Sequence, residues 1–135
     1  MSKLVLFYSY SGHTAKFAAE FAKANGAELI EVKSADKLSK FKAYTTGCYK
    51  AMTGRPMPIQ PIAVDFSKYS EIFAFAPVWA GGMAPCMIAA LQQVSEGVNV
   101  SLRLVSASGN SSKAKNTKYV EAMGLKVTGY EDIKG

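Results

Sequence analysis

Hydroxyl side chains gather near the start of the chain, in residues 9–14, which read Ser-Tyr-Ser-Gly-His-Thr. This segment contains no lysine or arginine. Hydroxyls together with backbone N–H groups suit a terminal phosphate monoester that is held without a formal cation. Serine and threonine are also common helix caps, so the same residues are typical of a structural turn. Taken alone, the residues leave both interpretations open.

The flanking residues place this segment between a strand and a helix. Residues 4–8 are an unbroken run of apolar β-formers, which predicts a strand buried on both faces. Phe17, Ala18 and Phe21 then recur at helical spacing, and Gly26 follows as a C-cap. The hydroxyl segment should therefore lie at a helix N-terminus, where free N–H groups and the helix dipole favour negative charge.

Two common nucleotide-binding motifs are absent. The segment lacks the G-x-x-x-x-G-K-[ST] pattern, in which a lysine reaches the β and γ phosphates, and no G-x-G-x-x-G of a dinucleotide fold occurs in the chain. A nucleotide triphosphatase and a classical dinucleotide fold are therefore disfavoured.

The rest of the chain alternates strands with helical patterns. We predict further strands at 28–32, 72–76, 100–105 and 125–130, the last at a sheet edge, and helices that begin near Pro85 and Lys113. Residues 34–54 give a partial helical stripe interrupted around 45–47, and the three prolines of 55–61 favour extended chain. The pattern predicts an α/β fold with an open, doubly wound, five-stranded parallel sheet, formed by residues 1–135 as a single domain.

Three loops follow predicted strands, at residues 9–14, 77–84 and 106–112, and each is made of small or hydroxylated residues around a glycine. Ligands of such sheets bind at the carboxyl ends of the strands, so the three loops should converge on one edge. Trp79, the only tryptophan, falls in the second loop. It is expected either to contact a flat ring or to pack over its own loop.

Three segments carry a resemblance to a known family. Ser9-x-Ser11-Gly12-x-Thr14 resembles the FMN phosphate loop of flavodoxins, usually written T/S-x-T/S-G-x-T. Residues 69–85 resemble the third strand and second flavin loop of short flavodoxin-like proteins, and residues 46–55 resemble a segment that several of them carry. The resemblance implies strand order 2-1-3-4-5 and FMN as cofactor.

The resemblance also implies which residues bind the cofactor. They are Ser9, Tyr10, Ser11, Gly12, His13, Thr14, Pro77, Val78, Trp79, Ala80, Gly81, Gly82, Ser106, Ala107, Ser108, Gly109 and Asn110.

Two positions depart from the family. His13 stands where many relatives have asparagine, and the third loop lacks the aromatic residue that flavodoxins often place there. One face of the flavin ring would then be open, which leaves room for a substrate.

The charge is unusual for that family. Sixteen Lys and Arg against ten Asp and Glu give a net charge of +6, whereas electron-carrying flavodoxins are typically acidic. The excess indicates either a generally basic surface or a face for acidic partners or phosphate-bearing substrates. The scattered lysines and the absence of a binding motif argue against nucleic acid.

Cysteine spacing and the N-terminus bear on location. Cys48 and Cys86 form no metal-type spacing and are expected to be free thiols of a cytoplasmic protein. Cys86 is expected at a helix start, where it is either packed and inert or has a lowered pKa. The N-terminal apolar run is too short for a signal peptide or a membrane span.

The sequence therefore predicts an FMN-binding redox protein that carries electrons between partners, either as a monomer or as a homodimer. One alternative is an NAD(P)H-dependent FMN reductase of quinones or similar small acceptors. Another is a flavodoxin-fold binding module without flavin. No Ser-His-Asp set, pair of catalytic carboxylates or metal cluster is recognisable, so no catalytic residue is assigned.

Overall fold

A parallel sheet forms the centre of the molecule in the computed structural model, which describes residues 2–35, 39 and 42–135. Its strands in the described part of the chain are β1 (Ser2–Phe7), β2 (Glu28–Glu31), β3 (Tyr69–Trp79), β5 (Asn99–Ser106) and β6 (Lys126–Lys134). They lie in the order β2-β1-β3-β5-β6, and each neighbouring pair is parallel. A short strand, β4 (Gly82–Met83), pairs antiparallel with the end of β3. Counted along the chain, the parallel strands have the predicted order 2-1-3-4-5, and the predicted fold class is confirmed.

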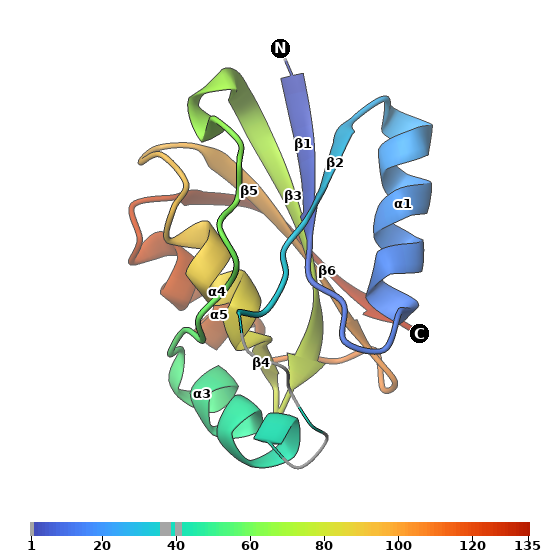
Figure 1. Cartoon of the computed structure of the whole chain (residues 1–135), viewed down its shortest axis with the longest axis vertical. Helices are drawn as coiled ribbons and strands as arrows, with labels where there is room; N and C mark the ends of the chain where they lie inside the picture. The colour runs from blue at the N-terminus through green and yellow to red at the C-terminus, as the bar shows by residue number, and fades with distance from the viewer. Residues whose placement is uncertain (1, 36–38, 40–41) are drawn as a thin grey trace.

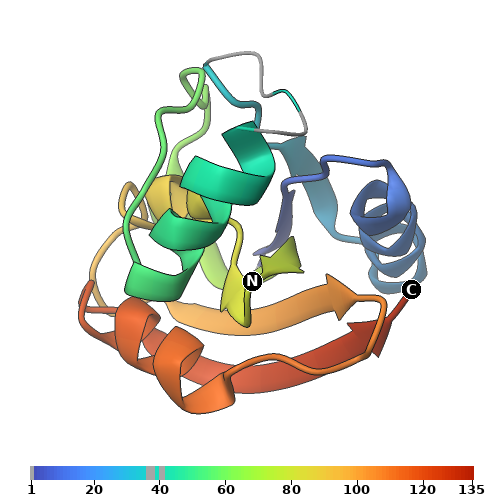
Figure 2. The same ribbon diagram turned by 90° about the horizontal axis from the view of Figure 1, so that it is seen from below.

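Helices cover the sheet and its carboxyl end (Figure 1). The helix α1 (His13–Asn25) lies on one face, and α4 (Pro85–Leu91) and α5 (Lys113–Glu121) follow on the other. A π-helical turn, η1 (Ala43–Gly47), continues into α3 (Cys48–Thr53), and a short 3-10 turn, η2 (Phe66–Lys68), precedes β3. Figure 2, seen from below, shows α3 near the viewer, in front of α4 and beside the β3–β4 hairpin.

The sheet separates two apolar clusters. Leu4 and Leu6 of β1 belong to the larger cluster, which contains α4, while Val5 and Phe7 belong to the smaller one under α1. Alternate side chains of a strand point to opposite faces, so a strand covered on both sides needs apolar residues at consecutive positions. This is why residues 4–8 are apolar without interruption.

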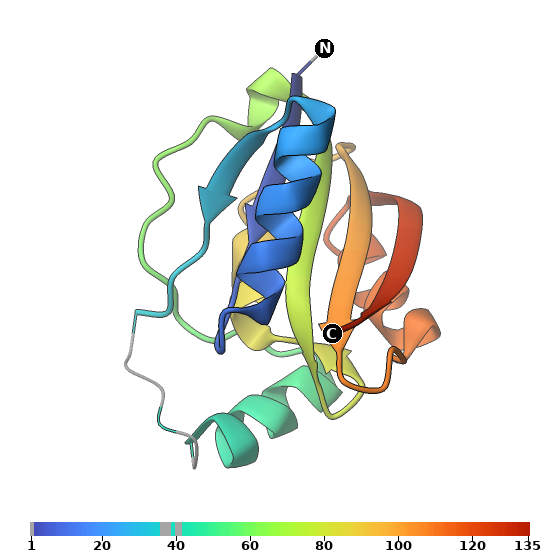
Figure 3. The same cartoon turned by 90° about the vertical axis from the view of Figure 1, so that its right-hand side faces the viewer.

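The α1 face is closed differently over β5 and β6. Figure 3 shows α1 lying in front of β1 and β3, with β5 and β6 beside it. There the Arg103 guanidinium stacks over the rings of Phe21 and Phe73, at 4.4 and 5.5 Å from their centroids. Its Nη1 also pairs with Glu131 Oε2 at 2.6 Å. A charged side chain thus covers the edge of the apolar cluster with its flat face and keeps one nitrogen paired.

The prediction that the third strand ends at Pro77 was wrong, because β3 continues through Pro77, Val78 and Trp79. The N–H of Tyr8 bonds to the carbonyl of Phe75, so the main-chain groups of Phe75 and, two residues on, Pro77 face the β1 side. Beyond the end of β1, the neighbour of Pro77 is Ala84, whose N–H donates to the Pro77 carbonyl at 3.0 Å. The Ala84 carbonyl accepts from the N–H groups of Met87 and Ile88 in α4, so the missing N–H of Pro77 leaves it with partners.

Residues 77–84, predicted as a loop, form the β3–β4 hairpin instead. Trp79 pairs with Gly82, and the two residues between them, Ala80 and Gly81, have φ of 51° and 85°. Positive φ at both central positions is the pattern of a type I′ hairpin turn. Trp79 is therefore the last residue of a strand, held at a fixed angle, rather than a loop residue.

Other boundaries also moved. The interruption predicted around residues 45–47 is not a break, because the backbone continues as the π-helical turn η1 into α3. The last strand extends to Lys134 and is an edge strand, as predicted. Within the described residues, none of the helices has the length and apolar character needed to cross a membrane.

Gly82 tests how tightly α3 packs on the hairpin. A Cβ at Gly82 would lie 2.2 Å from the carbonyl oxygen of Ala51, a backbone atom that cannot rotate away. We expect Gly82→Ala to lower the free energy of unfolding by about 1–3 kcal/mol, as forced overpacking does. Urea denaturation measures this.

Gly129→Ala is the matched control, since a Cβ there meets the Ser101 hydroxyl, a side-chain atom that can shift. It should cost less than Gly82→Ala. Equal losses for the two variants would contradict a rigid contact between α3 and the hairpin.

Candidate functional site

The α1 N-terminus is open and free of acidic residues. Gly12 is the N-cap, with φ of 99°, and no side chain caps the helix. The first-turn N–H groups of a helix have no intrahelical partners, so they are available to a ligand. The first turn contains no acidic residue, and therefore no side-chain anion competes with a bound one.

The hydroxyls of this loop have separate positions. Ser9 Oγ accepts a bond from the N–H of Gly12 at 3.0 Å, which closes the loop on itself. Ser11 is exposed, and Thr14 is buried with 3% of its surface accessible. None of these side chains caps α1, so the hydroxyl of Ser9 has a structural role in the turn and those of Ser11 and Thr14 do not act as helix caps. The donor set suits a phosphate group.

His13 is the first residue of α1, and its side chain is exposed. It lines a pocket of about 200 Å³ together with Lys16, Phe17 and Gly135, which brings it beside the last residue of the chain.

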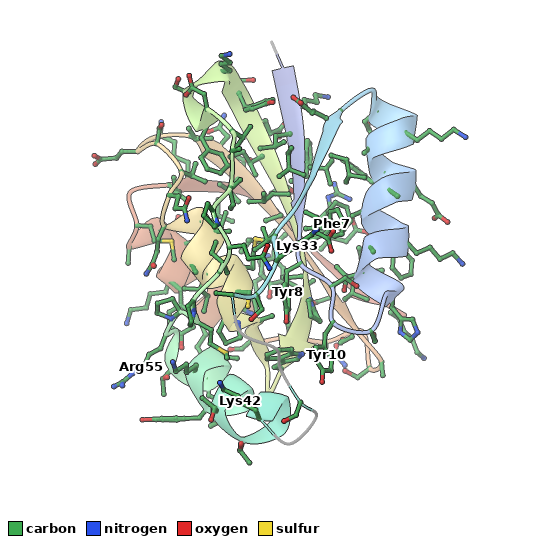
Figure 4. The ribbon with its side chains drawn as sticks, viewed as in Figure 1. Phe7, Tyr8, Tyr10, Lys33, Lys42 and Arg55 are labelled. Atoms are coloured by element: carbon green, nitrogen blue, oxygen red, sulfur yellow. The ribbon has the colours of Figure 1, made fainter. Side chains whose placement is uncertain are left out.

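Aromatic rings connect the first loop to the end of β3. Trp79 lies edge-on to Tyr8, at 6.1 Å between centroids, and edge-on to Tyr10, at 5.9 Å. Trp79 is half-buried, and Tyr10 is 40% exposed. Figure 4 shows Tyr8 and Tyr10 following β1 toward α3, so the aromatic groups stand at the carboxyl edge of the sheet.

One of these rings, that of Tyr8, carries a buried phenol that lies beside the Cys86 thiol. Tyr8 is 4% exposed, and its burial and the neighbouring Cys86 raise the pKa of its phenol well above the usual range. Burial also raises the pKa of the Cys86 thiol, although hydrogen bonds with Ser34 and Tyr8 act in the opposite direction. Cys86 is fully buried, so it is the packed thiol and not the activated one. Both cysteines are free, as predicted.

The second and third loops are joined by Asn116, a fully buried polar residue of α5. Its Oδ1 accepts from the N–H of Met83 at 3.0 Å. Its Nδ2 contacts the carbonyl of Gly81 at 3.3 Å and the hydroxyl of Tyr130 at 3.1 Å. The N–H of Ser112 also donates to that carbonyl, at 2.8 Å. These bonds fix the hairpin against the third loop.

The third loop holds its own shape. Ser106 Oγ accepts from the N–H groups of Gly109 and Asn110, at 2.9 and 3.2 Å, and Ser108 Oγ accepts from Asn110 at 3.3 Å. Ala107, Ser108 and Asn110 are exposed. Among the described residues, Ser112 at the end of the loop and Asn116 in α5 form hydrogen bonds with the hairpin, and neither was among the predicted site residues.

Three loops distant in sequence thus meet at one edge, as predicted, but the residues that join them were missed. Asn116 gave a weak signal, a polar residue inside a short basic helix. Gly47 gave another. A Cβ there would lie 2.7 Å from the Trp79 ring, so the end of η1, at the N-cap of α3, packs directly against the tryptophan.

Several solved structures that resemble this fold are described as flavoproteins. A flavoprotein from Lactobacillus acidophilus, crystallised in complex with FMN, is 25% identical over 96% of this chain and 91% of its own, with a TM-score of 0.79. Two further structures, described as flavoproteins, come from Bacteroides eggerthii, with a TM-score of 0.75 at 20% identity, and from Bacteroides uniformis, with a TM-score of 0.74 at 18% identity. They are covered over 86% and 88% of their length, and this chain over 96% in each case.

No protein-family model matches the chain, and neither does any curated protein. The likeness is thus structural: the chain has the flavodoxin-like fold, which it shares with these flavoproteins.

Proposed function

We propose that this chain binds FMN at the carboxyl edge of its sheet and acts as a redox protein that carries electrons between partners. The observation that carries the proposal is the open N-terminus of α1, where Gly12 leaves the helix uncapped beside the hydroxyls of Ser11 and Thr14. FMN supplies the redox chemistry when bound, and the protein supplies binding and orientation.

The phosphate end is assigned to residues 9–14. A phosphate dianion would accept bonds from first-turn N–H groups and nearby hydroxyls, and the positive end of the helix dipole favours its charge. A Cβ at Gly12 would meet no atom within 4 Å, so the space on that side of the residue is open. The L. acidophilus flavoprotein, crystallised with FMN, supports FMN as the cofactor of this fold, and the assignment of the phosphate to residues 9–14 is our own.

The ring end is assigned to the hairpin and the third loop. Tyr10 and Trp79 provide aromatic edges, and residues 80–82 and 106–110 provide small side chains that let backbone groups approach a flat ring. Because no aromatic residue stands in 106–110, one ring face stays accessible to a partner or a substrate.

One observation favours the NAD(P)H-dependent reductase as a second candidate. Lys50 and Arg55, on and just after α3, have no carboxylate partner among the residues that the structure describes. Unpaired cations beside a flavin site suit a phosphate-bearing electron donor. Reduction of bound FMN by NADPH without any added protein would support the reductase, and reduction only with a protein partner would support the carrier.

We expect the purified protein to be yellow and to prefer FMN over riboflavin. Each charge-assisted hydrogen bond contributes about 1.5–3 kcal/mol, so loss of two should weaken binding roughly hundredfold or more. Fluorescence titration of the apo-protein with each flavin measures both affinities. Equal affinities would exclude the phosphate site, and the absence of binding would favour a module without flavin.

Ser11 tests the phosphate loop without disturbing the fold, since its side chain is exposed. We expect Ser11→Ala to weaken FMN binding about tenfold, because one charge-assisted hydrogen bond is lost. The apo-protein should unfold within about 0.5 kcal/mol of the original.

Ser95→Ala, at an exposed serine after α4, is the control and should change neither quantity. If Ser11→Ala instead lowers apo stability and leaves FMN affinity unchanged, the hydroxyl is structural.

Trp79 tests the ring end. If the flavin lies near it, Trp79→Phe should brighten the emission of bound FMN while an aromatic ring still packs on Gly47. Trp79→Ala should also loosen FMN about tenfold or more, judging from rings that stack on aromatic side chains. Emission spectra and titrations, referenced to free FMN, report both effects. Unchanged emission and affinity in both variants would mean that the tryptophan only packs between Tyr8, Tyr10 and α3.

A further inference from the structure

A pocket lies on α3, outside the predicted FMN residues. It has a volume of about 320 Å³ and is lined by Thr45, Thr46, Tyr49, Lys50 and Arg55. Its lining therefore combines two hydroxyls, an aromatic ring and two cations. A volume of this size holds a fragment such as a phosphorylated nucleoside, rather than a whole dinucleotide.

The cations of this pocket, Lys50 and Arg55, have no carboxylate beside them in the part of the chain that the structure describes. The sequence around them is basic throughout, since residues 37–64 contain five lysines and arginines and no aspartate or glutamate. Such a surface attracts anions, and Arg and Lys are the side chains that bind phosphate groups.

An aromatic ring stands beside the cations. Tyr49 is 48% exposed, although large apolar side chains are usually covered, and the Arg55 guanidinium lies 5.8 Å from its ring centroid. Tyrosine and arginine planes are the groups on which nucleobases stack. An exposed ring next to phosphate-binding cations suits a nucleotide better than inorganic phosphate.

The pocket and the proposed flavin site share one helix. The backbone of η1 and α3 packs on the hairpin at two points, Gly47 against the Trp79 ring and Ala51 against Gly82. Tyr49 and Lys50 lie on the exposed and half-exposed sides of the same helix. A helix with its side chains is about 10 Å across, so an extended dinucleotide can reach from the pocket to the hairpin.

The geometry points to this pocket as the site for the phosphorylated adenosine end of NADPH, with Lys50 and Arg55 binding the 2′-phosphate and Tyr49 stacking on the base. This inference rests on the reductase as the second candidate function and names its donor. NADH lacks the 2′-phosphate, so the pocket should select NADPH.

The test is calorimetric titration of the FMN-loaded protein with adenosine 2′,5′-bisphosphate, and with 5′-AMP as the ligand that lacks the 2′-phosphate. We expect the bisphosphate to bind about tenfold more tightly than 5′-AMP, since it alone contacts both cations. The double variant Lys50→Gln, Arg55→Gln should lose this preference.

Lys68→Gln with Lys126→Gln is the matched control. It removes the same charge from two exposed lysines at the amino ends of β3 and β6, away from α3. This variant should keep the preference for the bisphosphate over 5′-AMP. Should the pocket variant fold poorly, amide shifts of Thr46 and Lys50 on addition of the bisphosphate to the original protein locate the ligand directly.

The outcomes separate this inference from the proposed function. If the protein does not retain FMN, the proposed function is contradicted. Titration of the apo-protein with the bisphosphate still measures the affinity of the pocket in that case. Absence of bisphosphate binding, equal binding of the two nucleotides, or equal losses in the pocket and control variants would overturn the inference. Absence of bisphosphate binding would instead favour an acidic protein as the partner of α3.

Discussion

The backbone of Gly82 lies so close to the carbonyl of Ala51 that no side chain fits between them. This contact seats α3 on the β3–β4 hairpin, and the hairpin in turn meets the other parts of the candidate site. Its Trp79 contacts the rings of Tyr8 and Tyr10, and its Gly81 carbonyl accepts bonds from the third loop and α5. Displacing α3 would therefore move the aromatic edge that is proposed to face the flavin.

Asn116 of α5 holds the same hairpin through hydrogen bonds, which also reach β6. A buried amide without partners would destabilise the fold, so each of its hydrogen bonds matters. Its donor and acceptor are both used, by Gly81, Met83 and Tyr130. The hydroxyl of Tyr130 also contacts Ser111 in the third loop. This network joins the hairpin, α5 and the edge strand β6, so the floor of the proposed ring site is held by polar bonds and not by apolar packing alone.

The two proposed anion sites differ in the charge of the groups that would bind the ligand. At α1 the donors are neutral groups and the helix dipole, which suits a phosphate held beside a ring without a side-chain cation. At α3 the donors are Lys50 and Arg55, which suit a ligand that exchanges and is attracted over a longer range. A tightly held cofactor and a passing donor would thus use different chemistry at neighbouring sites.

Much of this protein was predictable from local patterns. The apolar patterns of residues 4–8 and of α1 predicted which side chains are buried, because the period of apolar residues depends only on local geometry. The strand order and the convergence of three loops then followed from the resemblance to flavodoxins and from the rule that parallel strands end at one edge.

Other features needed the folded chain. Pro77 was predicted as a strand end, and only the fold shows that the carbonyl facing it, that of Ala84, has its partners in α4. Asn116 and Gly47 depend on contacts with the β3–β4 hairpin, more than thirty residues away, with which they share no sequence period. Lys50 and Arg55 stand among other basic residues in the sequence, and their pocket exists only where the helix turn and the chain after it meet. Periodicity records how a segment meets its surroundings on average, whereas a site depends on which particular atoms the tertiary fold brings together.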